Sequence, residues 1–246
     1  MTRSTKIVAT LGPASNNPEV LEQMFRAGVD VVRLNFSHGT VEDHRTRAEM
    51  VREVCRKAGR TVGIMGDLQG PKIRVGKFRD GKVTLKPGDA FILDADCEVG
   101  DQQRAGLDYK ELPRDVRAGD ILLLDDGRIE FEVERVAGNE VHCRVHHGGV
   151  LLNNKGINRR GGGLTASALT TKDMDDIRTA AAIKVDFLAV SFPKSSADMY
   201  MARQLLRAAG GEAFLIAKIE RAEAVEPGAL EDIMSACDGI MVARGD

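Results

Sequence analysis

The chain has 246 residues, a formal net charge of −2 and 43% hydrophobic residues, enough apolar material for one large domain or two smaller ones. The near-neutral charge, the absence of tryptophan and the 4% aromatic content argue against a surface for nucleic acid or an anionic membrane. Cys55, Cys97, Cys143 and Cys237 have no metal-finger spacing, and neither a signal peptide nor a membrane-spanning apolar run is recognisable. We therefore expect a reduced, cytoplasmic protein without nucleic-acid or membrane partners.

Short apolar runs alternate with amphipathic helical stretches from residue 6 onward. Asn17 and Pro18 predict the start of one helix, and Gly28 and Gly59 predict the ends of two helices. Strands that alternate with helices indicate βα units around a parallel sheet. Six strands are predicted, two fewer than a closed eight-stranded barrel needs; they cover residues 6–11, 30–36, 62–67, 186–191, 214–219 and 239–244.

The pattern changes between about residues 71 and 167. Segments such as "KVTLKPGDAFIL" and "GDILLLDDGRIEFEVERV" are β-rich, are separated by turn residues and have no helical period. We therefore predict an α/β fold in which a small all-β module interrupts one βα series. The predicted organisation is a first barrel part at residues 1–70, the inserted module at 71–168 and a second barrel part at 169–246.

Polar residues gather at the predicted carboxyl ends of the strands, where ligands bind in parallel α/β folds. In "VVRLNFSHG", the side chains of Arg33, Asn35 and Ser37 share one face of the strand because strand side chains alternate. Asp67 ends the third strand in "MGDLQG" and adds a carboxylate to the same rim.

The fifth and sixth strands repeat this arrangement. Lys218 and Glu220 in "IAKIE" share a face, as do Arg244 and Asp246 in "MVARGD". Since neighbouring strands lie about 4.8 Å apart, Glu220 and Asp246 could both reach one divalent cation, with substrate oxygens completing the shell as is usual for Mg²⁺. An ammonium and a guanidinium beside such a metal suit a phosphorylated, multiply anionic substrate.

Each of these residues has a simpler interpretation when it is taken alone. An arginine or lysine at a strand end is often only solvated or ion-paired, and Glu220 could simply begin a helix. The tripeptide "RGD" at residues 244–246 is also an integrin-recognition motif, but the apolar strand before it argues against a displayed loop. His38 could be a turn residue, and His146 and His147 are expected at the surface. The coincidence across several strands favours one shared site.

Eight segments resemble the successive signature segments of the pyruvate kinases: "KIVATLGPAS", "VVRLNFSHG", "GDLQGPKIRVG", "LLLDDGRI", "NNKGIN", "AVSFP", "IAKIERAEAV" and "MVARGD". The resemblance covers essentially the whole chain and is closest to the bacterial form that reads "DLQGPKIR". It implies the N-terminal part of a (β/α)₈ TIM barrel with a β-barrel B domain inserted after the third strand. It also implies phosphoryl transfer from phosphoenolpyruvate to ADP, giving pyruvate and ATP at the last step of glycolysis, and a homotetramer for the full-length parent.

The resemblance also implies roles for individual residues. Arg33 would bind the substrate phosphate, Lys218 would stabilise the transferring phosphoryl group, and Glu220 and Asp246 would hold Mg²⁺ or Mn²⁺. The backbone of Ala243, Arg244 and Gly245 would lie along the substrate carboxylate. The nucleotide contacts would come from Asn35, His38, Arg74 and, on the B domain acting as a lid, Lys155.

One position departs from the commonest pattern of the family. Many members hold K⁺ through residues that correspond to Asn35, Ser37, Asp67 and the backbone of Leu68, and they carry a glutamate where this chain has Lys72. A lysine supplies a fixed positive charge there, so we expect activity that does not require K⁺. Loss of activity of the full-length parent when K⁺ is replaced by a large organic cation would contradict this hypothesis.

The chain ends two strands before the barrel would close, and we expect it to be poorly active by itself. One alternative is therefore an inactive fragment that retains nucleotide, phosphate or partner binding. A metal-dependent aldolase of the phosphoenolpyruvate and pyruvate class is a third interpretation, although it gives no reason for "NNKGIN" on the inserted module. A kinase assay on this chain and on a version extended beyond Asp246 distinguishes the enzyme from the inactive fragment.

Overall fold

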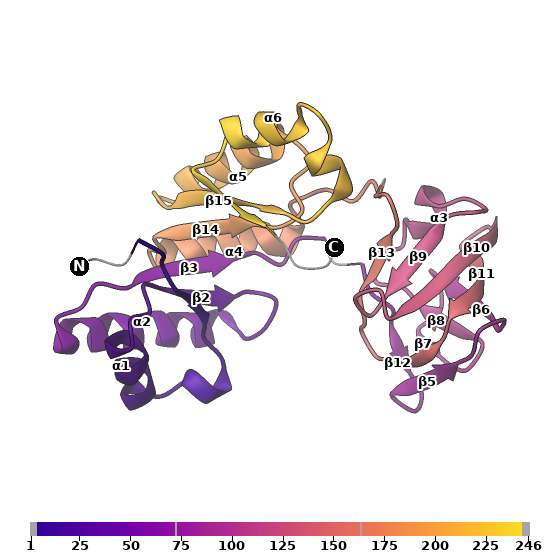
Figure 1. The fold of residues 1–246 in the computed structure, drawn as a ribbon, viewed down its shortest axis with the longest axis horizontal. Coiled ribbons are helices and arrows are strands. Elements are labelled where there is room, and N and C mark those ends of the chain that lie inside the picture. Colours follow the sequence, from indigo (N-terminus) through magenta and orange to yellow (C-terminus); the bar gives the residue numbers. More distant parts are fainter. Residues whose placement is uncertain (1–3, 72, 163, 243–246) are drawn as a thin grey trace. The chain divides into compact units, whose positions relative to one another are not determined.

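The computed structural model describes residues 4–71, 73–162 and 164–242 (Figure 1). The chain forms two compact units, each of which is described by itself. Among the described residues, unit 1 contains 4–71, 167–220 and 224–242, and unit 2 contains 73–162, 164–166 and 221–223. Within these ranges no helix has both the length and the apolar character needed to cross a membrane.

Unit 1 is built on a parallel sheet of six strands, whose order β1-β2-β3-β14-β15-β16 follows the chain. Each strand falls within its predicted range: β1 (Val8–Thr10), β2 (Val31–Asn35), β3 (Gly63–Asp67), β14 (Phe187–Val190), β15 (Phe214–Ile219) and β16 (Gly239–Val242). Because the order never reverses, right-handed crossovers place all their helices on one face of the sheet. This is the winding of a barrel, in contrast to the reversed order of a doubly wound sheet.

The helices of unit 1 pack their apolar faces on that side of the sheet. They are α1 (Pro18–Arg26), α2 (Val41–Ala58), α4 (Thr171–Ala182), α5 (Ser196–Ala208) and α6 (Ala229–Ser235), with 3₁₀ turns η1 (Pro13–Ser15) and η2 (Ala222–Val225) elsewhere in the chain. Phe25, Val32 and Leu188 belong to the resulting core and are fully buried. The side chain of Asn17 accepts backbone hydrogen bonds at the start of α1, and Gly59 ends α2 with a φ of 60°, which confirms these two of the predicted helix boundaries.

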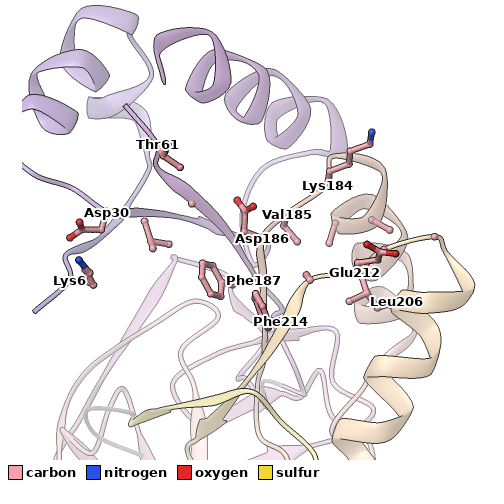
Figure 2. A pocket seen from close by; sticks show the side chains of 17 residues that line it. Lys6, Asp30, Thr61, Lys184, Val185, Asp186, Phe187, Leu206, Glu212 and Phe214 are labelled. Carbon is pink, nitrogen blue, oxygen red and sulfur yellow. The ribbon is translucent and has the colours of Figure 1, made fainter. Parts of the chain in front are cut away.

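The amino-terminal ends of the strands contain a hollow with apolar and charged walls. The cavity has a volume of about 780 Å³ and is lined by residues that include Asp30, Asp186, Phe187 and Phe214. Figure 2 shows the aromatic rings of Phe187 and Phe214 close to each other, with their centroids 6.0 Å apart. This cavity lies at the opposite end of the sheet from the predicted ligand site.

Three aspartates at this amino-terminal end form the same reciprocal contact with a neighbouring strand. In each case the aspartate N–H donates to a backbone carbonyl, and the N–H of that same partner residue donates to the aspartate carboxylate. The pairs are Asp30 with Ile7, Asp186 with Ile64 and Asp238 with Leu215, at distances of 2.7 to 3.0 Å. We call these contacts the aspartate clamps. Each clamp gives hydrogen-bond partners to the backbone N–H and carbonyl of the partner residue at the start of the strand pair. It thereby opposes a slip in the register of the two strands.

The main part of unit 2 follows β3 in the chain and precedes α4. Its main sheet has the order β13-β9-β10-β11-β6-β8, and two further sheets pair β12 with β5 and β4 with β7. The strands are β4 (Lys77–Phe78), β5 (Lys82–Leu85), β6 (Ala90–Asp94), β7 (Val99–Gly100), β8 (Arg104–Gly106), β9 (Ile121–Leu124), β10 (Ile129–Ala137), β11 (Glu140–His147), β12 (Gly149–Leu152) and β13 (Ile157–Arg159). The unit also contains a one-turn helix, α3 (Leu112–Asp115), which the strand pattern does not indicate. Its own apolar core includes Phe91, Phe131 and Leu122.

Candidate active site

Arg33 and the buried Asp67 form an ion pair between the carboxyl ends of β2 and β3. Arg33 Nε donates to Asp67 Oδ2 at 2.6 Å, and Arg33 Nη2 contacts the same oxygen. The remaining terminal nitrogen, Nη1, donates to Thr10 Oγ1 at 2.9 Å on β1. Asp67 is only 1% exposed, so its charge needs compensation, and this guanidinium supplies part of it. The arrangement places one arginine across three neighbouring strands.

Lys218 enters the same cluster from β15. Its ammonium donates to Ser191 Oγ at 2.7 Å and lies 2.9 Å from Glu220 Oε1 and 3.3 Å from Asp67 Oδ1. An ammonium has three donors, and this one has three oxygen neighbours from three different strands or strand ends. Arg33, Asp67, Lys218 and Glu220 therefore form one connected set of charges, which we call the strand-end cluster.

The residues expected at a K⁺ site include Asp67 of this cluster and three neighbours, Asn35, Ser37 and Leu68. Asn35 Oδ1 accepts the Ser37 N–H at 3.0 Å, and the Leu68 carbonyl accepts the Ser191 hydroxyl at 2.7 Å. Asp67 Oδ1 is buried and accepts no hydrogen bond from any described residue, and the Lys218 ammonium lies 3.3 Å from it. Carbonyl, amide and carboxylate oxygens are suitable ligands for a hard cation, and the buried Asp67 oxygen has lone pairs left for one.

Glu220 provides the carboxylate expected to bind Mg²⁺. Its Oε2 accepts the Phe192 N–H at 3.2 Å while Oε1 faces Lys218. Carboxylate oxygens fit Mg²⁺, although the described residues include no group of three or more histidine, cysteine, aspartate or glutamate side chains placed to hold a metal. The other positions with predicted roles at this rim lie outside the described residues: Lys72, Ala243, Arg244, Gly245 and Asp246.

Residues of α2 and α4 contact the loop that follows β2. Lys172 Nζ donates to the Phe36 carbonyl at 2.7 Å, and the buried ring of His44 packs edge-on against Phe36 with centroids 4.5 Å apart. Burial lowers the pKa of His44, and the Arg47 cation acts in the same direction. Exposed His38, on this loop, donates its backbone N–H to the Asn35 carbonyl. The loop is therefore held at Phe36 by both helices and is exposed to solvent at His38.

Unit 2 brings together its two predicted nucleotide-binding residues. Arg74 forms a β-bridge with Gly156, and the Val75 N–H donates to the Lys155 carbonyl at 2.9 Å. The Lys155 ammonium lies 2.6 Å from Asp125 Oδ1. Two cationic residues thus occupy adjacent segments of this unit. His146 and His147 in the same unit are exposed, as predicted.

Two residues of the site have no individual role predicted from the sequence. Ser191 is 1% exposed and links Lys218 to Leu68, and the sequence predicts only that its segment, "AVSFP", belongs to the family pattern. Side-chain alternation could have indicated Ser191, because a residue two positions beyond Ala189 lies on the same face of the strand as Ala189. His44 could have been recognised by its helical spacing of four and seven residues from the buried Ala48 and Val51.

Comparison with known proteins identifies the family to which this arrangement belongs. The family model for the pyruvate kinase barrel domain matches residues 2–246. The chain is 58% identical to the pyruvate kinase of Haemophilus influenzae and 57% identical to pyruvate kinase II of Salmonella typhimurium, over 99% of this chain and 52% of each relative. It is 44% identical to the pyruvate kinase of Mycobacterium intracellulare over 100% of this chain and 52% of that relative. The chain thus spans about half the length of these curated relatives, and it belongs to the pyruvate kinase family.

Proposed function

We propose that the protein to which this chain belongs transfers the phosphoryl group of phosphoenolpyruvate to ADP and forms pyruvate and ATP. The observation that carries the proposal is the strand-end cluster, in which the cations Arg33 and Lys218 both contact Asp67. Two fixed cations at the carboxyl ends of parallel strands suit a phosphorylated anion. Membership of the pyruvate kinase family supports this choice of substrates.

In the proposed reaction, each residue of the cluster has a separate task. Arg33 binds the phosphate of phosphoenolpyruvate, and Lys218 stabilises the charge on the phosphoryl group during transfer. The backbone of Ala243, Arg244 and Gly245 binds the substrate carboxylate. Glu220 and Asp246 would hold Mg²⁺ or Mn²⁺, which when bound neutralises charge on the phosphoryl oxygens. Protonation of the remaining enolate then gives pyruvate.

We also propose that unit 2 is the inserted B domain of the family and acts as its lid. Its Arg74 and Lys155 bind nucleotide phosphates, while Asn35 and His38 bind the nucleotide on the barrel. The proposed domains are 1–70, 71–168 and 169–246, with the barrel completed to eight strands in the full-length protein. That protein is proposed to be a cytoplasmic homotetramer.

The lysine at position 72 supports a further proposal about monovalent cations. Lys72 would supply the positive charge that K⁺ supplies next to Asp67 in members with a glutamate. Activity of the full-length protein should therefore persist when K⁺ is replaced by a large organic cation.

A coupled assay tests the proposed function directly. It follows pyruvate through lactate dehydrogenase in the presence of phosphoenolpyruvate, ADP and Mg²⁺, and compares two proteins. One is the 246-residue chain, and the other is the extended chain, in which residues 1–246 continue into the C-terminal half of the Salmonella typhimurium relative. We expect turnover in the extended chain, and its absence there would overturn the proposal.

A pair of lysine substitutions links turnover to the cluster. Lys218→Met in the extended chain should lower kcat at least about 100-fold, because a fixed cation that stabilises developing charge contributes about that much. Lys57→Met removes a lysine whose side chain is 73% exposed and should leave kcat unchanged. Circular dichroism of both variants establishes that the fold is retained. A Lys218→Met protein with normal turnover would remove Lys218 from its assigned task. If the 246-residue chain alone binds ADP without turnover, the inactive-fragment alternative applies to it.

A further inference from the structure

Ser191 occupies a buried position directly between two elements of the strand-end cluster. Its hydroxyl accepts a hydrogen bond from Lys218 Nζ at 2.7 Å and donates one to the Leu68 carbonyl at 2.7 Å. A serine hydroxyl has one proton to donate, so donation to Leu68 leaves its lone pairs directed toward Lys218. The hydroxyl is thereby oriented as an acceptor for the ammonium.

The backbone next to Ser191 is held in an unusual conformation. Phe192 has a φ of 55°, a left-handed conformation that is an outlier for a bulky side chain and tends to occur at functional sites. In this conformation its N–H points to Glu220 Oε2 at 3.2 Å. Two consecutive residues therefore contact the two side chains, Lys218 and Glu220, that carry the proposed chemistry on β15.

The position of Ser191 is determined by close packing on the loop after β3. A Cβ atom added to Gly70 would lie 2.6 Å from Ser191 Cβ and 2.9 Å from Phe192 Cδ2. Gly70 is anchored in turn, because its N–H donates to the fully buried carboxylate of Asp173 at 3.0 Å. The hydroxyl of Ser191 therefore has little freedom to move away from Lys218.

We propose that Ser191 is a positioning residue that holds the ammonium of Lys218 in the geometry needed for phosphoryl transfer; this rests on the proposed function. Lysine has a flexible four-carbon stem, and its two other neighbours here, Asp67 and Glu220, are carboxylates. Ser191 is the neutral partner, and it approaches from β14. It reduces the conformational freedom that Lys218 would lose on reaching the transition state.

Two substitutions in the extended chain separate this task from simple packing. Ser191→Ala removes the hydroxyl, and Ser191→Cys keeps a polar atom on Cβ but provides only a weak acceptor. If the hydroxyl positions Lys218, both variants should lower kcat by about 10- to 100-fold, the loss expected for a hydrogen bond to a charged group. The KM for phosphoenolpyruvate should change little, because the loss concerns the transition state.

A purely structural role predicts a different pattern. In that case Ser191→Cys would keep the kcat of the parent, and any loss in Ser191→Ala would accompany a fall in thermal stability. Either result would overturn the proposal. Ser235→Ala removes an exposed hydroxyl that donates to the Asp232 carbonyl and provides the matched control, with kcat and KM unchanged.

A labelling experiment on the 246-residue chain tests the positioning of Lys218 without requiring turnover. The protein is treated with a small amine-reactive reagent, and mass spectrometry compares the labelling rates of Lys218 and of half-exposed Lys172. Ser191→Ala should raise the labelling rate of Lys218 relative to that of Lys172 several-fold, since the Lys218 ammonium loses its shortest contact. An unchanged ratio would contradict the proposal even if the extended chain is an active kinase. A raised ratio in a protein without turnover would support the contact and refute only the proposed function.

Discussion

Asp186 and Ile64 exchange two hydrogen bonds at the amino-terminal end of the parallel sheet. The Asp186 N–H donates to the Ile64 carbonyl at 2.8 Å, and the Ile64 N–H donates to Asp186 Oδ2 at 2.7 Å. The clamp immediately precedes the paired residues Phe187 and Met65 of β14 and β3. The same register aligns Asp67 with Ala189 at the other end, two residues before Ser191. The clamp and the candidate site are thus connected through one strand pair.

Loss of this clamp should be measurable as a loss of stability. Asp186→Ala should lower the free energy of unfolding of the 246-residue chain by about 1 kcal/mol, the usual net value of a hydrogen bond. Asp186→Asn retains a side-chain oxygen as acceptor and should cost less. Urea unfolding gives both values. The matched control is Asp175→Ala, which removes a carboxylate that is 67% exposed and pairs with Arg178 and should have almost no effect. Equal losses for Asp186→Ala and the control would show that the clamp contributes nothing.

Gly70 should tolerate a methyl group less well than Gly59 does. Both have positive φ, 67° and 60°, so alanine at either position costs about 1 kcal/mol of backbone strain. A Cβ at Gly59 meets no atom within 4 Å, whereas at Gly70 it collides with Ser191 and Phe192. Overpacking should therefore add about 1–3 kcal/mol to the destabilisation by Gly70→Ala. Urea unfolding of the two variants measures this difference. In the extended chain, Gly70→Ala should also lower kcat, because Ser191 is displaced.

His44 should make the stability of unit 1 depend on pH. Burial lowers its pKa from the usual 6.5; Arg47 acts in the same direction, while a backbone hydrogen bond with His38 acts in the opposite one. The unfolded chain therefore takes up a proton near pH 6.5 that the folded chain takes up only at lower pH. The associated stability is fully present above about pH 6.5 and decreases as the pH falls toward the lowered value.

The measurement for His44 is urea unfolding at about pH 7.5 and about pH 5.5. The native sequence should lose roughly 1 kcal/mol between these values, and His44→Gln, which does not titrate, should lose less. His147→Gln, at a side chain that is 74% exposed, should behave like the native sequence. The interpretation fails if His44→Gln retains the full pH dependence.

Lys155 should contribute to nucleotide binding and little to folding. Lys155→Met should weaken ADP binding by about 10- to 100-fold, as expected when a charge-assisted contact to phosphate is lost. Arg128 remains within 3.8 Å of Asp125, so the carboxylate that faces Lys155 keeps a cation nearby. Titration calorimetry with ADP on the 246-residue chain, or the KM for ADP of the extended chain, gives the affinity. Lys82→Met, at an exposed lysine of the same unit, is the control and should bind ADP normally.

Much of unit 1 could be predicted from local sequence. Short apolar runs between helical stretches placed the six strands, and Asn17 and Gly59 marked helix boundaries, because such preferences arise between near neighbours in the chain. The alternation of side chains within a strand placed Arg33 and Asn35 on one face of β2. It could not show that Arg33 spans from Thr10 to Asp67, because that contact depends on the pairing of three strands.

The sequence by itself determined the order of the strands and helices, the polar character of the strand ends and the family resemblance. Only the tertiary structure decided which donors and acceptors form hydrogen bonds with one another. The hydrogen bonds from Ser191 to Leu68, from Gly70 to Asp173 and from Lys172 to Phe36 join residues more than 100 positions apart. Local propensity contains no information about such partners, because burial and strand register select them only when the whole sheet has formed.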